Sequence, residues 1–474
     1  MRSFLKNIKS RDFLIAGFVW LCLFALALWF YKERTIFVDI SFHVFYMIRD
    51  NSFEIQNGRF VSVFTQLAPL MASRMHLDLN TILMLYSAVF VIYYFLVFVI
   101  IYGVFRNTTL AWLYLAMQIL FVTDTFYWIQ SELPQGMAIL FLVIAYMQNM
   151  TQLPQKAGAM KYFVLYFLIY MTAYAHPILI VPFFFAMLYF RFFDTQKVSK
   201  TLIHVTTLAY ILIFIVKNYL LRASHHDRDN MERLKNFKEF FPDYFHIPSN
   251  AKFIGYCFHD YYFLIIALLF IVGYFLWKRR ILLAMLILLS FGVYLLVVNI
   301  SFPTGGEQFY IENLYLPLGF FVLLPFLDLL EMWKLKEVVF YSLFLIFAGI
   351  RLFDISYSSK KFTERLQWER NFIEKTQNEK QKKIIVGQTL VPIDTLMMSW
   401  ATPYEFWILS SVEYPEQRSI VIDYGLDKYT WTQDDNKSFI TQWGVFPYNE
   451  LPKNYFNFTD TSKYAIYRDS LPFR

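Results

Sequence analysis

The sequence predicts a mostly α-helical, polytopic membrane protein with a small soluble α/β domain at its C-terminal end. Of its 474 residues, 58% are hydrophobic and only 17% are charged. Soluble proteins average about 45–50% apolar and about 25% charged residues. Long apolar runs recur up to residue 353, and the chain from there to residue 474 is polar. This pattern excludes a secreted globular enzyme, a zinc-finger protein and a disordered scaffold.

About eleven membrane-spanning helices are predicted, because a bilayer is crossed by about 20 mostly apolar residues. Three of the runs are short, and two of these are separated only by Ala175 and His176. The runs are Phe13–Tyr31, Thr81–Phe105, Leu110–Phe126, Gly136–Met147, Tyr162–Tyr174, Pro177–Phe190, Leu202–Leu221, Tyr261–Trp277, Ile281–Ile300, Ile311–Leu330 and Val338–Phe353.

Loop charge predicts the orientation. With the N-terminus inside, the short inside segments carry fifteen Lys and Arg residues, whereas the short outside connections carry none. Basic residues mark the cytoplasmic side. The first apolar run lacks a small-residue cleavage site, so we expect a retained helix rather than a signal peptide. We therefore expect a multi-pass protein of a bacterial inner membrane, with a cytoplasmic N-terminus and a periplasmic C-terminus.

Two domains follow from this layout. Residues 1–353 form the transmembrane domain, with long outside loops at 32–80 and 222–260, and residues 354–474 form a periplasmic domain. The start of the latter pairs Arg365 with Glu369 at a four-residue spacing, which predicts a solvated helix leaving the membrane. The stretches Ile384–Gly387 and Ser419–Tyr424 are predicted strands.

Several partner classes receive no support from the residues. The formal net charge of +7 is spread between apolar spans, so no nucleic-acid partner is expected. The two cysteines form no zinc motif, and no histidine spacing favours a metal. Gly305-Gly306 is not a nucleotide loop, because no Gly-Lys-Ser follows. We expect no metal and no cofactor.

The first outside loop carries the sharpest chemical pattern. Asp39 follows the first span closely, His43 lies four residues later and would share its helix face, and Asn57-Gly58-Arg59 forms a turn signal. A carboxylate at a lipid–water boundary has a raised pKa and can act as a general base. An arginine nearby can bind a phosphate. The alternative is that Asp39 is an exposed helix cap, whose replacement hardly changes stability, and that Arg59 contacts lipid headgroups.

This arrangement resembles the GT-C glycosyltransferases, which use lipid-phosphate-linked sugars. The shared features are a retained first helix, a large outside loop with a membrane-proximal aspartate, many spans and an outside C-terminal domain. The Asp39 region and the Asn-Gly-Arg-Phe stretch are similar to the bacteriophage-type glucosyltransferase and protein O-mannosyltransferase branches. In many members a glutamate adjoins the aspartate, whereas Ile40 stands here.

Further polar residues are candidates for the same site. Asp124 and Glu132 lie between two spans, where carboxylates need water or a partner. The resemblance implies that this loop lines the acceptor site, which makes Glu132 the second candidate catalytic carboxylate; as an alternative it caps the next helix. His176 stands at a break between apolar runs and either contacts a phosphate or forms a turn.

Two more segments are assigned to substrate binding. Lys217, Arg222 and His225 lie near the outside end of a span and form a candidate phosphate cradle, although a lysine there also suits a headgroup contact. GT-C members place an arginine and a tyrosine followed by proline in a late outside loop. Tyr310 matches the tyrosine, but Glu312 stands in place of an arginine.

The sequence therefore predicts an inverting, metal-independent glycosyltransferase. It would transfer a sugar from a polyprenyl-phosphate donor to a periplasmic glycan, lipid or protein acceptor, in contact with membrane lipids. Asp39 would be the general base. The alternatives are a flippase for lipid-linked oligosaccharides, and an O-antigen polymerase or ligase.

Overall fold

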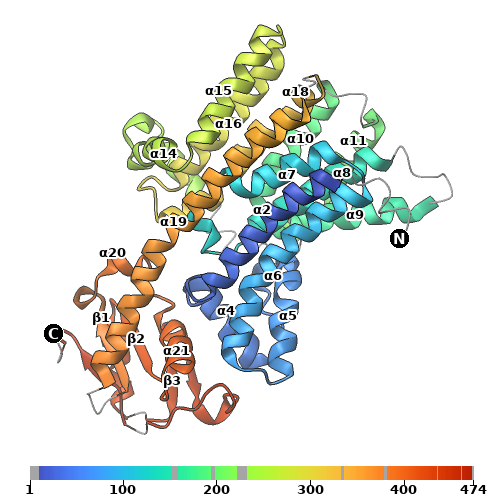
Figure 1. Ribbon diagram of the computed structural model, residues 1–474. Helices are drawn as coiled ribbons and strands as arrows, with labels where there is room; N and C mark the ends of the chain where they lie inside the picture. Colours follow the sequence, from blue (N-terminus) through green and yellow to red (C-terminus); the bar gives the residue numbers. More distant parts are fainter. Residues whose placement is uncertain are drawn as a thin grey trace.

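The protein is a helical bundle with a small domain attached at one end (Figure 1). In this computed structural model 76% of the chain is helical. The residues that the structure describes are 10–150, 158–193, 198–220, 232–332, 336–377, 382–434, 436–460 and 462–471.

Six helical stretches are long and apolar enough to cross a membrane, and a seventh results if the pair α14 and α15, bent by 89°, counts as one span. These lengths and compositions support a helical membrane protein. The six stretches are Arg11–Trp29 in α2 (Ser10–Trp29), Leu79–Val104 in α6 (Leu79–Val99) and η3 (Ile100–Val104), Lys200–Asn218 in α11 (Lys200–Ile215) and η8 (Val216–Leu220), α16 (Ile281–Ser301), Gln308–Leu330 in α17 (Gln308–Leu323) and α18 (Phe326–Met332), and Glu337–Thr376 in α19 (Glu337–Gln377).

The predicted number of eleven spans is not confirmed. Each predicted run coincides with helical structure, but α7 (Thr108–Leu120) and α10 (Ile180–Phe192) are short apolar helices. Helix α8 (Glu132–Asn149) is buried along almost its whole length and packs against α9 (Gly158–Ala175). Because neighbouring protein surrounds such a helix, its apolar residues indicate burial in the protein core as well as membrane insertion.

Shorter helical elements connect and flank these stretches. Helix α3 (Tyr31–Thr35) links the first span to α4 (Val38–Asp50), and α5 (Val63–Arg74) packs beside α6. The other elements of this part are η1 (Gln56–Gly58), η2 (Phe60–Ser62), η4 (Asp124–Phe126), η7 (Pro177–Leu179), η9 (Arg233–Lys235), α13 (Asn236–Phe240), η10 (Tyr244–His246), α14 (Pro248–His259) and α15 (Tyr262–Trp277).

Helix α19 connects the bundle to the small domain. It has 41 residues, and at 1.5 Å per residue it is about 60 Å long, twice the roughly 30 Å of a bilayer core. The helix therefore continues far beyond the predicted last span, which ends at Phe353, and reaches the C-terminal domain (Figure 1).

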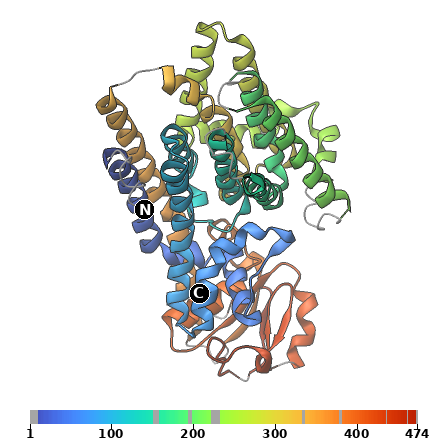
Figure 2. The same cartoon turned by 90° about the vertical axis from the view of Figure 1, so that its right-hand side faces the viewer.

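The C-terminal domain contains a three-stranded parallel sheet in the order β2-β1-β5 and a β3-β4 hairpin. Both predicted strands are present, as β1 and β2. Helix α21 packs on β2 and also on α4 of the first loop, so the domain lies against that loop (Figure 2). The elements are β1 (Lys383–Gly387), η11 (Gln388–Leu390), α20 (Ile393–Leu396), α21 (Thr402–Glu413), β2 (Ser419–Asp423), η12 (Leu426–Asp434), β3 (Ser438–Ile440), β4 (Val445–Pro447), η13 (Tyr448–Glu450) and β5 (Ala465–Tyr467).

The interpretation of the α19 extension as a solvated helix is wrong at its centre. The predicted pair of Arg365 and Glu369 exists at 2.9 Å, but the side chains are only 1% and 0% exposed. Arg365 also pairs with Glu405 of α21. The spacing of these charges predicted the ion pair correctly, but it could not reveal that a distant helix covers this face.

Candidate active site

Asp39 lies in the first turn of α4, directly after a strained residue. The φ angle of Val38 is +38°, which is rare for a β-branched side chain. The Val38 N–H donates a 2.5 Å hydrogen bond to Glu405 Oε1 of the C-terminal domain, and Arg365 donates to the carbonyl of Ile36 at 3.2 Å. Both contacts hold the chain where it turns into α4. The C-terminal domain thus fixes the backbone that carries Asp39.

The carboxylate of Asp39 is partly buried and has one defined partner. Trp128 Nε1 donates a 2.8 Å hydrogen bond to Asp39 Oδ2, and among the described residues no donor contacts Oδ1. Burial raises the pKa of Asp39 to about 7, against the opposing effect of the Trp128 hydrogen bond; the nearby charge of Glu132 raises it further. A carboxylate of this kind exchanges protons near neutral pH and has one oxygen available to a substrate.

Arg59 and Glu132 form a buried ion pair. Arg59 Nη1 lies 2.9 Å from Glu132 Oε2, and each residue is 8% exposed. Glu132 occupies the first turn of α8, where the helix dipole favours a carboxylate, and Gln130 Nε2 donates to its other oxygen at 3.4 Å. The pairing gives Glu132 a role in holding the guanidinium of Arg59 in place.

His43 is buried and lies within 3.3 Å of Gln66 Nε2 through its Nδ1 atom. Burial lowers the pKa of His43 to about 4, so its imidazole is neutral at pH 7. His176 begins η7, and its Nδ1 accepts a 3.3 Å hydrogen bond from the Ile178 N–H. The turn interpretation of His176 is therefore correct. A residue can form such a turn and still face a cavity, as His176 does.

Close packing of α8 near His176 depends on Gly136. A Cβ atom at Gly136 would clash with the side chains of Leu179 and Ala175, which flank His176. Only glycine allows α8 and the break between α9 and η7 to lie this close. Gly136 stands one turn after Glu132, and Glu132 and His176 line the same cavity.

These residues line one cavity of about 860 Å³, a volume within the range of small-molecule sites. Six of the ten predicted site residues meet there, from five separate segments of the chain: Asp39, His43, Arg59, Glu132, His176 and Tyr310.

The cavity has two further kinds of wall. The bundle helices contribute apolar side chains, and the C-terminal domain contributes Met398, Trp400 and Trp443. The apolar wall comprises Ile178, Ile180, Val181, Phe214, Val297, Val298 and Leu314.

Of the remaining predicted site residues, Lys217 and Asp124 lie elsewhere in the structure. Lys217 is buried in η8 and donates to the carbonyl oxygens of Ala173 and Tyr174 at 3.3 and 3.4 Å, near the end of α9. Its ammonium thus satisfies helix carbonyls and does not line the cavity. Asp124 lines a different cavity. Arg222 and His225 lie outside the described residues.

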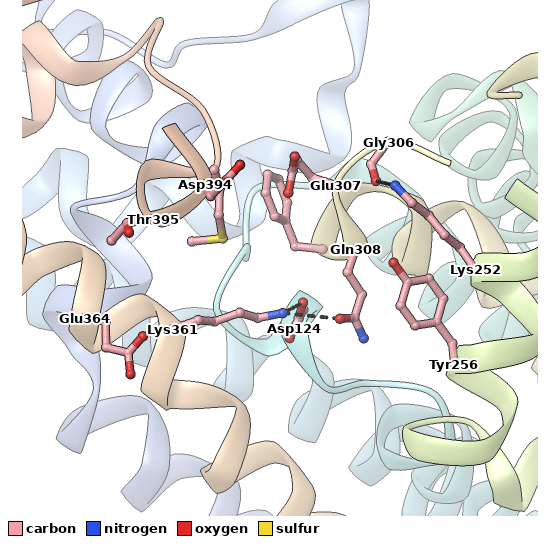
Figure 3. A pocket seen from close by; sticks show the side chains of 12 residues that line it. Asp124, Lys252, Tyr256, Gly306, Glu307, Gln308, Lys361, Glu364, Asp394 and Thr395 are labelled. Carbon is pink, nitrogen blue, oxygen red and sulfur yellow. Dashed lines mark hydrogen bonds and ion pairs between the residues drawn. The ribbon is translucent and has the colours of Figure 1, made fainter. Parts of the chain in front are cut away.

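The second cavity, of about 400 Å³, is polar (Figure 3). Asp124 is paired there with Lys361 of α19, whose ammonium also donates to Gln308 Oε1 at 3.3 Å. Across this cavity Lys252 donates to the carbonyl of Gly306 (Figure 3). Phe309 lines both cavities. The assignment of Asp124 to the same substrate site as Asp39 is therefore not supported by the geometry.

Glu312 accepts several hydrogen bonds that the sequence did not indicate. Its carboxylate accepts hydrogen bonds from the Thr123 N–H at 2.7 Å, the Thr125 N–H at 3.0 Å and the Tyr261 hydroxyl at 3.1 Å. The carboxylate therefore supplies the hydrogen-bond acceptor that the buried backbone N–H groups of this turn require. This explains an acid at a position where the resemblance implies an arginine.

Four cavity residues escaped the sequence reasoning. Trp128 was within a polar connection already noted, but nothing marked its indole as the partner of Asp39. Arg233 lines the cavity with its guanidinium over the Phe302 ring at 4.5 Å. The sequence feature that could have identified Arg233 is its position in the predicted outside loop at 222–260. Trp400 and Trp443 lie in the polar tail and had no local pattern.

Among the described residues, no group of three or more His, Cys, Asp or Glu side chains is arranged to hold a metal ion. Comparison of the chain with protein-family models, with curated proteins and with solved structures found no match.

Proposed function

We propose that this protein is an integral membrane glycosyltransferase that uses a polyprenyl-phosphate-linked sugar as its donor. The observation that carries the proposal is the composition of the large cavity. It joins a carboxylate with a pKa near neutrality, a set of cationic and hydrogen-bonding side chains, and an apolar wall supplied by the bundle helices. Each part fits one part of the same amphiphilic substrate.

The apolar wall supports binding of a lipid chain. Ile180 and Val181 belong to α10, Val297 and Val298 to α16, and Leu314 to α17, and two of these helices are candidate spans. A lipid between these helices would bury apolar surface at about 25 cal/mol per Å². Leu314 lies one helical turn from Tyr310, so the polar and apolar walls adjoin on α17.

The cationic side supports binding of a phosphate. Arg59, Arg233 and His176 line the same cavity from three different segments. Guanidinium groups bind phosphate oxygens with paired donors. Arg59 is held by Glu132, which fixes its orientation before substrate arrives, and such preorganisation favours the charged transition state.

In the proposed reaction, Asp39 removes the proton from an acceptor hydroxyl. The acceptor oxygen attacks the anomeric carbon of the donor sugar from the face opposite the phosphate. The new carbon–oxygen bond forms as the bond to the phosphate oxygen breaks, so the anomeric configuration inverts and polyprenyl phosphate departs. Arg59 and Arg233 balance the charge of the departing phosphate, and His176 can donate a hydrogen bond to it through Nε2.

The location follows from the same proposal. Loop charge supports a cytoplasmic N-terminus, and in this orientation the cavity and the C-terminal domain lie on the opposite side. We assign the protein to a bacterial inner membrane, with its active side in the periplasm. The acceptor would be a glycan, lipid or protein of that compartment.

The test is a sugar-transfer assay with purified variants in lipid nanodiscs. Asp39→Asn keeps the shape of the side chain but accepts no proton, so the rate should fall by about 10²–10⁴-fold. Arg59→Ala should weaken donor binding. Asp78→Asn is the matched control, because Asp78 is an exposed helix cap outside the cavity whose carboxylate accepts from the Thr81 N–H.

Three outcomes would contradict the proposal or its assignment of Asp39. Wild-type turnover by Asp39→Asn would end the assignment of Asp39, and Glu132 would be tested next. Movement of a labelled lipid-linked oligosaccharide between leaflets, without any sugar transfer, would establish a flippase. Joining of whole lipid-linked glycans would instead indicate a polymerase or ligase.

A further inference from the structure

The wall that the C-terminal domain contributes to the large cavity contains a stacked pair of tryptophans. Trp400 follows α20, and Trp443 lies in the turn between β3 and β4. Their ring centroids are 4.4 Å apart and their planes differ by 22°. Both side chains line the cavity, and Trp443 is 63% exposed. A large indole thus faces solvent at the edge of a substrate-sized cavity.

The pair is held close to Asp39. Phe42, three residues after Asp39 on α4, contacts both rings edge-on, at 5.9 Å for Trp400 and 6.3 Å for Trp443. Residues three apart on a helix are neighbours on its surface. The stacked rings therefore contact the helix that carries the proposed general base, about one turn after Asp39.

The turn that carries Trp443 is well defined by its hydrogen bonds. The Gly444 N–H donates to Thr441 Oγ1 at 3.0 Å, and the Thr441 N–H donates to the Gly444 carbonyl at 2.8 Å. A Cβ atom at Gly444 would lie 2.7 Å from the Phe446 ring, so the backbone packs closely there. The exposure of Trp443 is consequently a feature of an ordered turn.

An exposed aromatic face of this kind suits one class of ligand. The face of an indole is apolar and carries a partial negative charge. A pyranose ring has polarised C–H groups on its faces and hydroxyl groups around its edge. Such a ring can cover the indole with its C–H groups while its hydroxyls stay hydrated or bond to polar neighbours. Gln56 and Asn57 line the same cavity and can supply such bonds.

We propose that Trp400 and Trp443 form the subsite for a sugar ring of the acceptor, so that the acceptor is a carbohydrate. This inference rests on the proposed glycosyltransferase function and narrows its acceptor to one class. The acceptor is the fitting substrate because the pair adjoins the helix that carries the base, which has to meet the acceptor hydroxyl. A lipid chain fits less well, because the apolar residues of this cavity come mainly from the bundle helices.

The experiment measures carbohydrate binding directly by tryptophan fluorescence, using the full-length protein in nanodiscs and a panel of short oligosaccharides. Trp443→Ala removes the exposed ring of the pair. We expect the affinity of the best oligosaccharide to fall about tenfold, which corresponds to about 1.4 kcal/mol of binding free energy. Trp443→Phe keeps an aromatic face and should recover most of that affinity.

Trp431→Ala is the matched control, because Trp431 is also exposed (44%), belongs to the same domain and does not line the cavity. It should leave oligosaccharide binding at the wild-type level. A thermal melt of each variant separates loss of binding from loss of folding. Undecaprenyl phosphate binding to the wild type is measured in parallel, because its absence would reject the proposed donor without bearing on the tryptophan pair.

Three results would overturn the inference. Binding of no oligosaccharide by the wild type would remove the subsite. Equal carbohydrate affinity of wild type and Trp443→Ala would show that the pair does not bind the sugar. Reduced binding of Trp443→Ala to phospholipid vesicles, with unchanged carbohydrate affinity, would assign the exposed ring to the membrane surface.

Discussion

The raised pKa of Asp39 predicts how activity depends on pH. A general base works only when it is ionised, and a pKa of about 7 leaves about one tenth of the carboxylate ionised at pH 6 and about nine tenths at pH 8. The rate should therefore rise about tenfold between these values and become constant above pH 8. An aspartate with its ordinary pKa would give a constant rate over the whole range.

The hydrogen bond from Trp128 makes this prediction specific. It stabilises the ionised form of Asp39, so removing it in Trp128→Phe should raise the pKa further. A hydrogen bond to a charged group is worth about 1.5–3 kcal/mol, which corresponds to about one to two pH units. At pH 7 the variant should be about 5- to 50-fold slower, and it should regain about half or more of the wild-type rate at pH 9.

The assay is kcat/KM for sugar transfer between pH 5.5 and 9, in nanodiscs of one lipid composition. Trp112→Phe is the control, because Trp112 is buried against Phe344 of α19, with ring centroids 4.7 Å apart, and does not line the cavity. Its profile should match that of the wild type. A flat wild-type profile, or a shift to lower pH in Trp128→Phe, would refute the reasoning.

Four other predictions concern stability, positioning and topology. Burial disfavours the ionised form of Asp39, so the contribution of Asp39 to stability falls as the pH rises from about 4 to about 7. In a thermal melt at pH 8, Asp39→Asn should therefore be more stable than the wild type by on the order of 4 kcal/mol. Equal melting of both proteins at pH 8 would contradict this. Arg59→Met or Glu132→Leu alone should destabilise by up to about 3–5 kcal/mol in a thermal melt, and the double variant by less. Glu405→Gln should lower kcat more than it changes KM, and should move the pH profile to lower pH because the charge of Glu405 raises the pKa of Asp39; an unchanged profile would argue against this. Reporter fusions after residues 193 and 278 should be cytoplasmic and one after residue 358 periplasmic, and a cytoplasmic signal from the last would place the C-terminal domain on the other side.

The local parts of the site were predictable from sequence. Asp39 and Arg59 stand in the connection between the first two apolar runs, and Glu132 stands shortly before another run. A charged residue close to the membrane is costly unless it has a partner or a function. That physical argument operates over a few residues, so it can be applied without a structure. The alternative in which Asp39 is an exposed helix cap differs from the structure, because Asp39 is half-buried in the first turn of α4 and accepts a hydrogen bond from Trp128 of a distant segment.

The features that the sequence could not reveal depend on contacts between distant segments of the chain. Lys217 has the position of a phosphate ligand in the sequence, yet it satisfies the carbonyls of Ala173 and Tyr174. The number of spans is not confirmed for a related reason, because α8 is apolar and also buried by neighbouring helices. Hydropathy measures the preference for leaving water and does not distinguish lipid from protein as the new environment.

The contact between the C-terminal domain and the first loop explains why the domain matters for the proposed chemistry. The strained φ of Val38 is unfavourable on its own and persists only where the surroundings determine it. Here the determinant is Glu405, which binds the Val38 N–H and is held by Arg365, the same residue that binds the carbonyl of Ile36. Because Val38 immediately precedes Asp39, the backbone orientation at Asp39 is set by residues more than 300 positions later in the chain. The domain therefore completes the site from two sides, through the backbone under the base and through the tryptophan pair beside it.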